Sequence, residues 1–315
     1  MENIENTFSE YHIPVLYYET IENLITNKDG VYLDCTLGGG GHSEGILKNI
    51  SEKGMVISID QDEQAIKFAS KRLEPYKNRW KVYKDNFQNL DSVLYMAGKY
   101  EVDGILMDIG VSSTQLDDET RGFSYRFDTR LDMRMDKSSP LSAYEVVNDY
   151  PEEKLSKIIY EYGEEKFARK IARFICEERD KKKIETTGEL VNIIRRAYTG
   201  KTQKHPAKKT FQAIRIEVNK ELEVLEIAIE KAVKCLKKGG RLAIITFHSL
   251  EDRIVKNKFR ELEKGCTCPP ELPVCICGKK PQVKVLTKKP ICAGENELVY
   301  NNRAHSAKLR LVEKI

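Results

Sequence analysis

Two acidic residues flank a run of four glycines, and the combination suits the binding of a nucleoside. Asp34 ends one apolar run, the glycines and His42 follow, and Asp60 ends the next apolar run. Glycines let backbone approach a ligand closely, and their N–H groups would lie at the start of the next helix, where a carboxylate or phosphate binds. An acid at the end of the second strand meets ribose hydroxyls in such folds. We therefore expect a nucleoside-containing ligand at Asp34, Gly38, Gly39, Gly40, Gly41 and Asp60.

The position of Asp34 helps to identify that ligand. A nicotinamide-binding G-x-G-x-x-G motif would open directly after the strand, whereas here the acid comes first and the glycines begin four residues later. A carboxylate opposes a pyrophosphate but attracts the ammonium and sulfonium groups of S-adenosylmethionine. The charge pattern favours S-adenosylmethionine over NAD, and a tight turn without a ligand is the alternative interpretation.

Two more strand-like runs end in polar residues. Residues 81–83 lead to Asp85, Asn86 and Phe87, which could contact an adenine, although a polar turn beside a core phenylalanine is the alternative. Residues 103–107 lead to Asp108 and a turn that contains Ser112 and Ser113. Parallel strands present their carboxyl ends at one edge of the sheet, so we expect Asp108 and both serines in the active site.

His248 follows a later strand-like run, 241–247, and should reach the same edge. We expect it to line the substrate pocket, with a polar strand end as the alternative. Ser249 lacks the glycine pattern of a nucleophile elbow, so the sequence does not support a serine hydrolase.

The elements that position these residues predict an α/β fold. Strand-like runs alternate with helical periodicity, which indicates parallel βαβ units in a Rossmann-like domain with a mainly parallel sheet. About 130 residues separate the fourth run from Leu242, too many for one crossover, and their pattern is helical. We therefore predict an inserted all-α domain at 135–205 between the two parts of the main domain, 1–134 and 206–315.

Several local signals add detail to this prediction. Thr186 and Glu189 have the spacing of a capping box that opens a helix. One long amphipathic helix is expected over 210–232, and Gly239-Gly240 should separate the helical region from the strand at 241. Residues 282–287 and 308–312 alternate like an antiparallel edge pair.

Composition narrows the class of protein. The chain has 315 residues, 40% of them hydrophobic, and a formal net charge of +4, which supports sizeable cores with a mild basic excess. No signal peptide and no membrane-spanning run is evident. We expect a soluble cytoplasmic protein that does not bind membranes.

Two segments could meet a nucleic acid. Residues 195–209 carry six cationic residues and no acid, so phosphate is their natural partner, with a solvated surface as the alternative. Residues 121–134 interleave four arginines with aromatics that could stack on unpaired bases, unless those rings pack inward. The candidate RNA-binding residues are Arg121, Phe123, Arg134, Arg195, Arg196, Lys201, Lys204, Lys208 and Lys209.

The chain has eight cysteines, and four of them are clustered. A cytosolic setting argues for thiols rather than disulfides. Cys266, Cys268, Cys275 and Cys277 could bind a structural zinc ion, although C-x-C is less usual than C-x₂-C and free or redox-labile thiols are the alternative.

Longer strings of sequence resemble the bacterial RsmH (MraW) family. They are GGGGHS at 38–43, DIGVSSTQLD at 108–117, RGFS at 121–124, LDMRM at 131–135, FQAIRIEVN at 211–219, FHSLEDR at 247–253 and SAKLR at 306–310. The resemblance implies a class I methyltransferase that uses S-adenosylmethionine to methylate N4 of a cytidine in the decoding region of 16S rRNA. We expect this rRNA, within the 30S subunit, as the partner. By motif, it implies cofactor contacts from Gly40, Gly41, His42, Asp60, Phe87, Asp108 and Gln115.

The sequence departs from the family pattern at Thr129-Arg130, Lys208-Lys209 and His305, which affects the expected RNA contacts more than the chemistry. The cytosine amine is a poor nucleophile because its lone pair is delocalised into the ring. We therefore expect Asp108 and groups of the turn 110–113 to accept hydrogen bonds from its N–H groups, which would localise the lone pair on the nitrogen. A methyltransferase acting on another RNA or a small molecule, or a non-catalytic RNA-binding module, remains the alternative. The sequence does not show whether the protein forms a homodimer. It also does not show whether the substrate is naked RNA or an assembled subunit.

Overall fold

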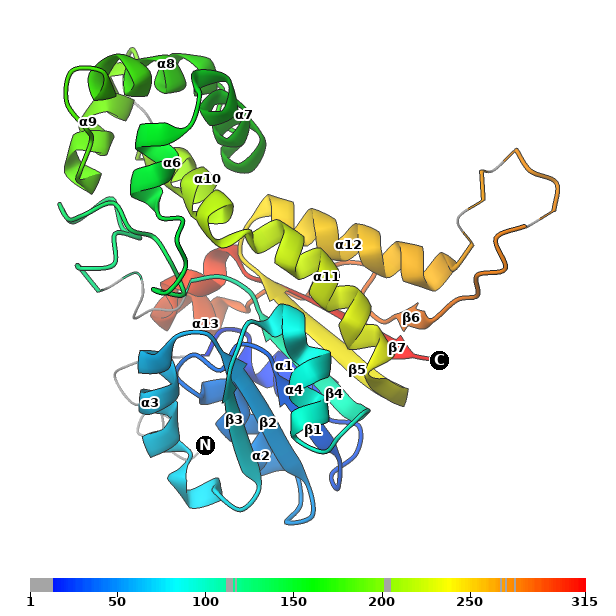
Figure 1. Ribbon diagram of the computed structural model, residues 1–315. Coiled ribbons are helices and arrows are strands. Elements are labelled where there is room, and N and C mark those ends of the chain that lie inside the picture. The colour runs from blue at the N-terminus through cyan, green and yellow to red at the C-terminus, as the bar shows by residue number, and fades with distance from the viewer. Residues whose placement is uncertain are drawn as a thin grey trace. The chain divides into compact units, whose positions relative to one another are not determined.

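The computed structural model divides into two compact units, which we describe separately. It describes residues 14–111, 116, 118–200, 205–266, 268–269, 271–274 and 276–315. The first unit comprises residues 1–110 and 222–315, and the second comprises residues 111–221. Figure 1 shows the sheet of the first unit and the helices of the second. Within the described residues, no helix combines the length and the apolar character needed to cross a membrane.

The first unit is built on a seven-stranded sheet in the order β3-β2-β1-β4-β5-β7-β6. The five strands from β3 to β5 are parallel, and β7 runs antiparallel to both β5 and β6. This confirms the predicted α/β class, with a mainly parallel Rossmann-like sheet, and the predicted antiparallel pair at its edge. The strands are β1 (Val31–Asp34), β2 (Met55–Asp60), β3 (Trp80–Lys84), β4 (Val102–Asp108), β5 (Leu236–Thr246), β6 (Val283–Val285) and β7 (Lys308–Lys314).

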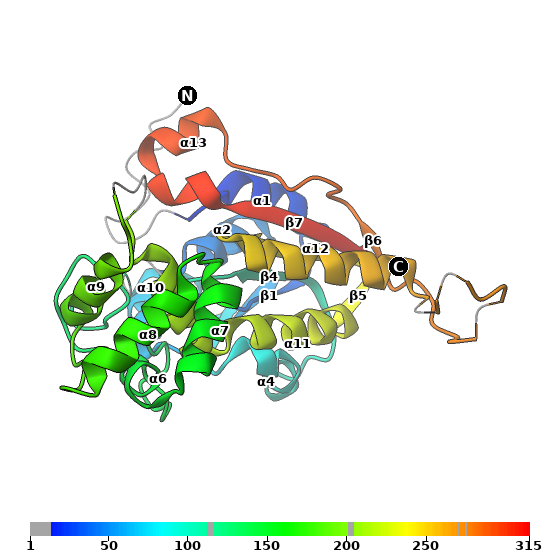
Figure 2. The same ribbon diagram turned by 90° about the horizontal axis from the view of Figure 1, so that it is seen from above.

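Helices cover both faces of this sheet because its strands are apolar on both faces. Successive residues of a strand point to opposite faces. Leu33 accordingly belongs to one apolar core and Tyr32 to the other. In Figure 2, α4 and α11 follow one side of the sheet, and α1 and α13 follow the other. The helical elements of this unit are α1 (Tyr17–Leu24), α2 (Gly41–Asn49), α3 (Glu63–Arg72), η2 (Glu74–Tyr76), η3 (Phe87–Asn89), α4 (Leu90–Met96), α11 (Glu221–Lys234, whose first residue falls in the second unit), α12 (Ser249–Lys264), α13 (Glu295–Tyr300) and η4 (Asn302–Ser306).

The second unit is helical, as the predicted all-α insert requires. Its core gathers apolar side chains of the five helices whose bounds are described below and of the segment before them. The predicted capping box is present, since the Thr186 hydroxyl accepts from the backbone N–H of Glu189 and the Glu189 side chain accepts from that of Thr186. The helices are α6 (Ala143–Asp149), α7 (Glu152–Gly163), α8 (Ala168–Arg179), α9 (Thr187–Arg196) and α10 (Lys208–Asn219).

The boundaries of this unit differ from the predicted 135–205. Phe123, Leu131 and Met133 are buried in its core, so the segment before residue 135 belongs to it. At the other end, Phe211 and Ile214 of α10 pack into the same core. We therefore place the boundaries at 110/111 and 221/222, where the compact units divide.

Two predicted details of the return to the sheet are wrong. The expected single helix over 210–232 is two helices, α10 and α11, because Lys220 adopts a left-handed conformation with φ of 50° and ends the first. Gly239 and Gly240 lie inside β5 and do not precede it. Gly239 has φ of 78°, and the pairing of β5 with β4 shifts register beside it.

Candidate functional site

Three carboxylates gather at the carboxyl edge of the sheet, as the strand pattern predicted. Asp34, Asp60 and Asp108 are the last residues of β1, β2 and β4. Strand β1 lies between the other two, and Asp34 is in register with Ser58 of β2 and Leu106 of β4. Like charges so close together oppose ionisation, so this edge suits a ligand that brings positive charge.

The glycine run forms a turn that leads directly into a helix. Gly38 and Gly40 have positive φ angles of 49° and 77°, and α2 begins at Gly41. A Cβ on Gly41 would collide with the ring of Pro14, and one on Gly40 would lie 3.1 Å from Cβ of Ala69. The turn therefore has little room for side chains, and it sits at the N-terminus of a helix, where backbone N–H groups favour an anion.

Asp60 holds the shape of this turn. Its Oδ2 accepts a hydrogen bond of 2.8 Å from the backbone N–H of Gly38, and its Oδ1 accepts one of 2.8 Å from the N–H of Asp62. The pKa of Asp60 is raised to about 6, by burial above all and by the charges of Asp62 and Asp34, while these two hydrogen bonds lower it. A hydroxyl donor such as a ribose would add a third hydrogen bond to a carboxylate that burial disfavours.

Asp34 has a different role from the predicted contact with the ligand's cationic groups. The residue is fully buried, and its oxygens accept from the Ser43 hydroxyl at 2.6 Å and the backbone N–H of Thr36 at 3.1 Å. Ser58 Oγ lies 2.9 Å from Ser43 Oγ and accepts from the indole N–H of Trp80. The hydroxyls of Ser58 and Ser43 thus form a chain of hydrogen bonds that ends at the Asp34 carboxylate. Asp34 therefore acts on Asp60 and Asp108 through its charge.

Asp108 is the carboxylate whose hydrogen bonding is least complete. Its side chain is 15% exposed, and its Oδ1 is buried without a hydrogen-bond partner among the described residues. Its backbone N–H donates to Thr36 Oγ1 at 2.7 Å, which fixes the end of β4. The pKa of Asp108 is raised to about 8, by burial above all and by the charges of Asp34 and Glu251, while the charge of Arg303 lowers it.

His42 lies beside Asp108 near the start of α2. Its Nε2 is 3.1 Å from the backbone carbonyl of Val15, and because a carbonyl only accepts, this nitrogen carries a proton. Its Nδ1 is 3.6 Å from Oδ2 of Asp108, too far for a hydrogen bond. His42 is 95% shielded and stacks loosely on Tyr17 with ring centroids 6.4 Å apart.

The residues after β3 are positioned as the strand pattern predicted. The backbone N–H of Asp85 donates to the carbonyl of Asp60 at 3.1 Å, which brings the end of β3 beside that of β2. Asp85 Oδ1 accepts from the backbone N–H of Asn86 and from the side chain of Asn89. Phe87 is partly buried against the core. Both side chains help to form the turn, and their contact with an adenine remains a prediction.

His248 caps the helix that follows β5. Its Nδ1 accepts from the backbone N–H of Glu251 at 3.4 Å, and Glu251 Oε2 accepts from the N–H of Phe247 at 2.8 Å. The imidazole is therefore committed to the start of α12, and its expected place in a substrate pocket remains a prediction. Ser112, Ser113 and Gln115, also expected at the site, lie outside the described residues.

Some contributors to this site were not predicted from the sequence. Glu251 and Arg303 act on Asp108 through their charges, and Pro14 restricts Gly41. The spacing of His248 and Glu251 is that of a capping box with histidine in place of serine, which could have revealed Glu251. No local signal in the sequence links Arg303 to Asp108 or Pro14 to Gly41.

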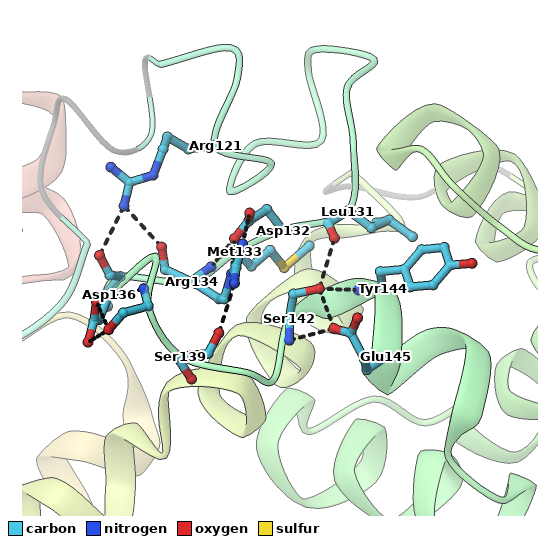
Figure 3. Close-up of polar contacts among 12 residues, drawn as sticks. Arg121, Leu131, Asp132, Met133, Arg134, Asp136, Ser139, Ser142, Tyr144 and Glu145 are labelled. Carbon is cyan, nitrogen blue, oxygen red and sulfur yellow. Dashed lines mark hydrogen bonds and ion pairs between the residues drawn. The ribbon is translucent and has the colours of Figure 1, made fainter.

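In the second unit, the segment of arginines and aromatics packs inward. Arg121 is buried, and its guanidinium donates to the carbonyls of Arg134 and Met135 at 3.0 and 3.1 Å (Figure 3). Phe123 is 5% exposed and belongs to the helical core. The expectation that Arg121 and Phe123 contact RNA is therefore wrong for this conformation, because both side chains stabilise the fold.

Arg134 also has a structural role in this segment. Its guanidinium forms two hydrogen bonds with the carboxylate of Asp132 and donates to the carbonyl of Ser139 at 2.8 Å (Figure 3). Nearby, Ser142 and Glu145 form a reciprocal cap at the start of α6. These contacts fix the loop between Arg121 and α6, and they leave Arg134 only partly exposed.

The basic segment 195–209 keeps its cations mostly at the surface. Arg195 and Lys208 are exposed, and Lys209 is exposed with Nζ donating to the carbonyl of Glu164. Arg196 pairs with Glu178 at 2.6 Å. Lys201 and Lys204 lie outside the described residues.

An aromatic stack that the sequence did not predict lies beside these cations. The His205 and Tyr125 rings are parallel, with centroids 4.3 Å apart, and Arg195 lies 3.3 Å from the His205 ring. Burial and the charge of Arg195 lower the pKa of His205, which favours its neutral form. Planar groups beside cations suit RNA, whose unpaired bases stack on such surfaces.

Three of the four clustered cysteines come together in the first unit. The ligand atoms of Cys266, Cys268 and Cys277 all lie within 4.8 Å of one another. None of the three forms a disulfide. Cys275 lies outside the described residues.

Comparison with known proteins identifies the family. The chain is 63% identical over 315 residues to the ribosomal RNA small subunit methyltransferase H of Fusobacterium nucleatum, covering 100% of this chain and 99% of that protein. Proteins of the same name from Clostridium botulinum strain Kyoto and Clostridioides difficile are 61% and 54% identical, covering 96% and 97% of this chain and 99% of each relative. The family model of the MraW methylases matches residues 9–315. The chain therefore belongs to the MraW methylase family.

Proposed function

We propose that this protein transfers the methyl group of S-adenosylmethionine to N4 of a cytidine in the decoding region of 16S rRNA, within the 30S subunit. The name shared by its relatives supports a small-subunit ribosomal RNA as the substrate. The resemblance described from the sequence supports the choice of nucleotide and atom. The observation that carries the chemistry is the buried Asp108 oxygen without a partner at the edge where three acids meet. A ribosomal substrate would place the activity in the cytoplasm.

The residues present fit S-adenosylmethionine. The N-terminus of α2, which no Cβ obstructs at Gly40 and Gly41, would hold the methionyl carboxylate. Asp60 would accept from the ribose hydroxyls, and Phe87 would cover the adenine. Asp108 would face the cationic groups, and Asp34 would add negative charge from behind. When bound, S-adenosylmethionine supplies an electrophilic methyl group.

Asp108 would act on the acceptor amine. The lone pair of the cytosine amine is delocalised into the ring, and an acceptor on its N–H groups returns electron density to the nitrogen. The Oδ1 of Asp108 is buried without a partner among the described residues, so it can accept such a bond without giving up another. A pKa of about 8 favours the protonated form near neutral pH, and a cation in the site would shift Asp108 to the ionised form that accepts.

Two neighbours would keep Asp108 in place for this role. The hydroxyl of Thr36 accepts from the backbone N–H of Asp108 and fixes the strand end. His42, held by the carbonyl of Val15, limits the space beside Oδ2. Positioning of this kind supplies much of the rate in a transfer between two bound partners.

The second unit would contribute affinity for RNA. Arg195 and Lys208 offer exposed positive charge, and the stacked Tyr125 and His205 rings offer a planar surface next to it. Contacts with phosphate position a nucleic acid, and stacking favours unpaired bases over a duplex. A structured single-stranded region of rRNA matches this combination.

The decisive experiment is substrate mapping. The protein is incubated with methyl-labelled S-adenosylmethionine and 30S subunits from cells that lack this methylation, in parallel with naked 16S rRNA. We expect label in one cytidine as N4-methylcytidine. Label on another RNA, or only on a small molecule, would replace the proposed substrate. Tight binding of S-adenosylmethionine without transfer to any acceptor would favour a non-catalytic RNA-binding module.

A further inference from the structure

We propose that Cys266, Cys268 and Cys277 are ligands of a structural zinc ion that fixes the loop between α12 and β6 in the first unit. This inference does not depend on the proposed function. Figure 1 shows the described parts of this loop, in orange, extending away from α12 and β6. Cys266 and Cys268 lie on its outgoing arm, and Cys277 lies on its returning arm.

The spacing of the sulfur atoms suits a tetrahedral metal. Two thiolates bound to one zinc ion at about 2.3 Å, with a tetrahedral angle between them, lie about 3.8 Å apart. The sulfurs of Cys277 and Cys266 are 3.8 Å apart. The third sulfur, of Cys268, lies with them in a cluster no wider than 4.8 Å. A disulfide would require about 2.05 Å between two sulfurs, and none is formed here.

Apolar packing does not explain why these thiols meet. Val274 is 70% exposed and Ile276 is 79% exposed, so the apolar side chains of the loop point to solvent near the cysteines. Residues in such a loop lose conformational entropy when they are ordered, and buried area offers little to offset that cost. A metal ion that joins the two arms would supply the missing stabilisation, since metal binding and folding are coupled.

The base of the loop brings its two arms together and places the cysteines for binding. Gly265 packs against the backbone of Lys280 and Pro281 so closely that any Cβ would collide. The backbone N–H of Gln282 donates to the carbonyl of Leu262 at 2.9 Å. Because the arms are already joined at this base, closing the ring of ligands costs less than it would in an open chain.

The ligand set selects the class of metal. Thiolates favour zinc over the hard cations magnesium and calcium, which prefer oxygen. The cluster contains three cysteines and no carboxylate or histidine. Structural zinc sites have four ligands, and the sequence offers Cys275, two residues before Cys277, as a candidate for the fourth. Each thiol gives up its proton on binding, so affinity should fall at acidic pH.

Metal titration of the full-length protein tests the proposal. Reduced protein freed of metal by a chelator is titrated with zinc against a chromophoric competitor, and separately with cobalt. Wild-type protein should bind one zinc ion per chain and show the intense absorption of thiolate-to-cobalt charge transfer. The double variant Cys266→Ser/Cys277→Ser should bind zinc at least about tenfold more weakly. Cys292→Ser, which changes an exposed cysteine outside the cluster, should bind like the wild type.

Proteolysis gives a second readout that needs no variant. Zinc should slow tryptic cleavage after Lys279, which is exposed on the returning arm, and leave cleavage after the exposed Lys53 unchanged. The proposal is overturned if wild-type protein shows no thiolate charge-transfer absorption with cobalt. It is also overturned if the double variant folds and binds zinc as tightly as Cys292→Ser, or if the reduced cysteines form a disulfide in air and protect the loop equally without metal.

Discussion

Nδ1 of His42 lies 3.6 Å from Oδ2 of Asp108, while the other carboxylate oxygen of Asp108 is buried without a hydrogen bond among the described residues. The distance is too long for a hydrogen bond, so the histidine positions the carboxylate without satisfying it. An acid in this state is ready to interact with an incoming cation or N–H donor. This relationship is the basis of three of the predictions below.

Removing the charge of Asp108 should nearly abolish methyl transfer. In Asp108→Asn the side chain keeps its shape but its amide accepts more weakly than a carboxylate and cannot take up charge. We expect single-turnover transfer to 30S subunits to fall by about 10² to 10⁴-fold. Asp149→Asn, an exposed change on α6, is the matched control and should leave the rate unchanged. A folded Asp108→Asn protein with the wild-type rate would show that Asp108 has no part in the chemistry.

The same substitution should stabilise the protein when no ligand is bound, and more so at high pH. The folded protein holds the Asp108 proton up to a pKa of about 8, whereas the unfolded chain releases it near the ordinary value of 3.8. Stability therefore falls as pH rises between these values, and a neutral asparagine avoids that loss. Thermal unfolding should show Asp108→Asn gaining about 2 °C or more over wild type at pH 9, with a smaller gain at pH 5. An equal difference at both pH values would mean that Asp108 is not perturbed in this way.

The glycine turn should tolerate no side chain at its entry to α2. Gly41→Ala places a Cβ against the ring of Pro14, and such overpacking costs about 1–3 kcal/mol. Gly294→Ala is the control because its Cβ would meet open space and its φ of −72° suits any residue. Urea unfolding should show a loss for Gly41→Ala and a change within about 0.5 kcal/mol for Gly294→Ala. Equal stability of the two variants would contradict the close packing of the turn.

The exposed cations of the second unit should carry part of the affinity for rRNA. Arg195→Gln/Lys208→Gln should weaken binding to 16S rRNA and lower the salt dependence of the binding constant by about one to two charges. Lys53→Gln/Lys77→Gln removes two exposed cations from the first unit and serves as the control. Filter binding across a range of salt concentrations provides the comparison. If both double variants lose the same affinity, net charge rather than this surface governs binding.

Much of the fold was predictable because its signals are local. Apolar runs that end in Asp34, Asp60 and Asp108 identified three parallel strands and the edge at which the acids meet. Periodicity also identified the helical insert and the capping box at Thr186. These features depend on neighbouring residues in the chain, which is why the sequence alone reveals them.

Other features depend on tertiary contacts and were not predictable. The left-handed Lys220 that separates α10 from α11 has no glycine to announce it. Arg121 and Phe123 lie in a segment whose composition is typical of RNA binding, yet both side chains pack inward. Phe123 belongs to the helical core, and Arg121 donates to the carbonyls of Arg134 and Met135. Asp34 was expected to face a ligand, and only the structure shows that Ser43 and Thr36 occupy its oxygens. Composition alone does not distinguish a buried guanidinium or carboxylate from an exposed one.

The most direct test of the central claim is calorimetry of S-adenosylmethionine binding in two buffers that differ in ionisation enthalpy, from pH 6 to 9. If Asp108 faces the bound cation, binding near pH 7 will release a proton from this residue, because the cation lowers a pKa of about 8. The release should vanish above about pH 9, where Asp108 is already ionised, and the Asp108 contribution should be missing in Asp108→Asn at every pH. Absence of binding, or identical proton release by wild type and Asp108→Asn near pH 7, would contradict the account.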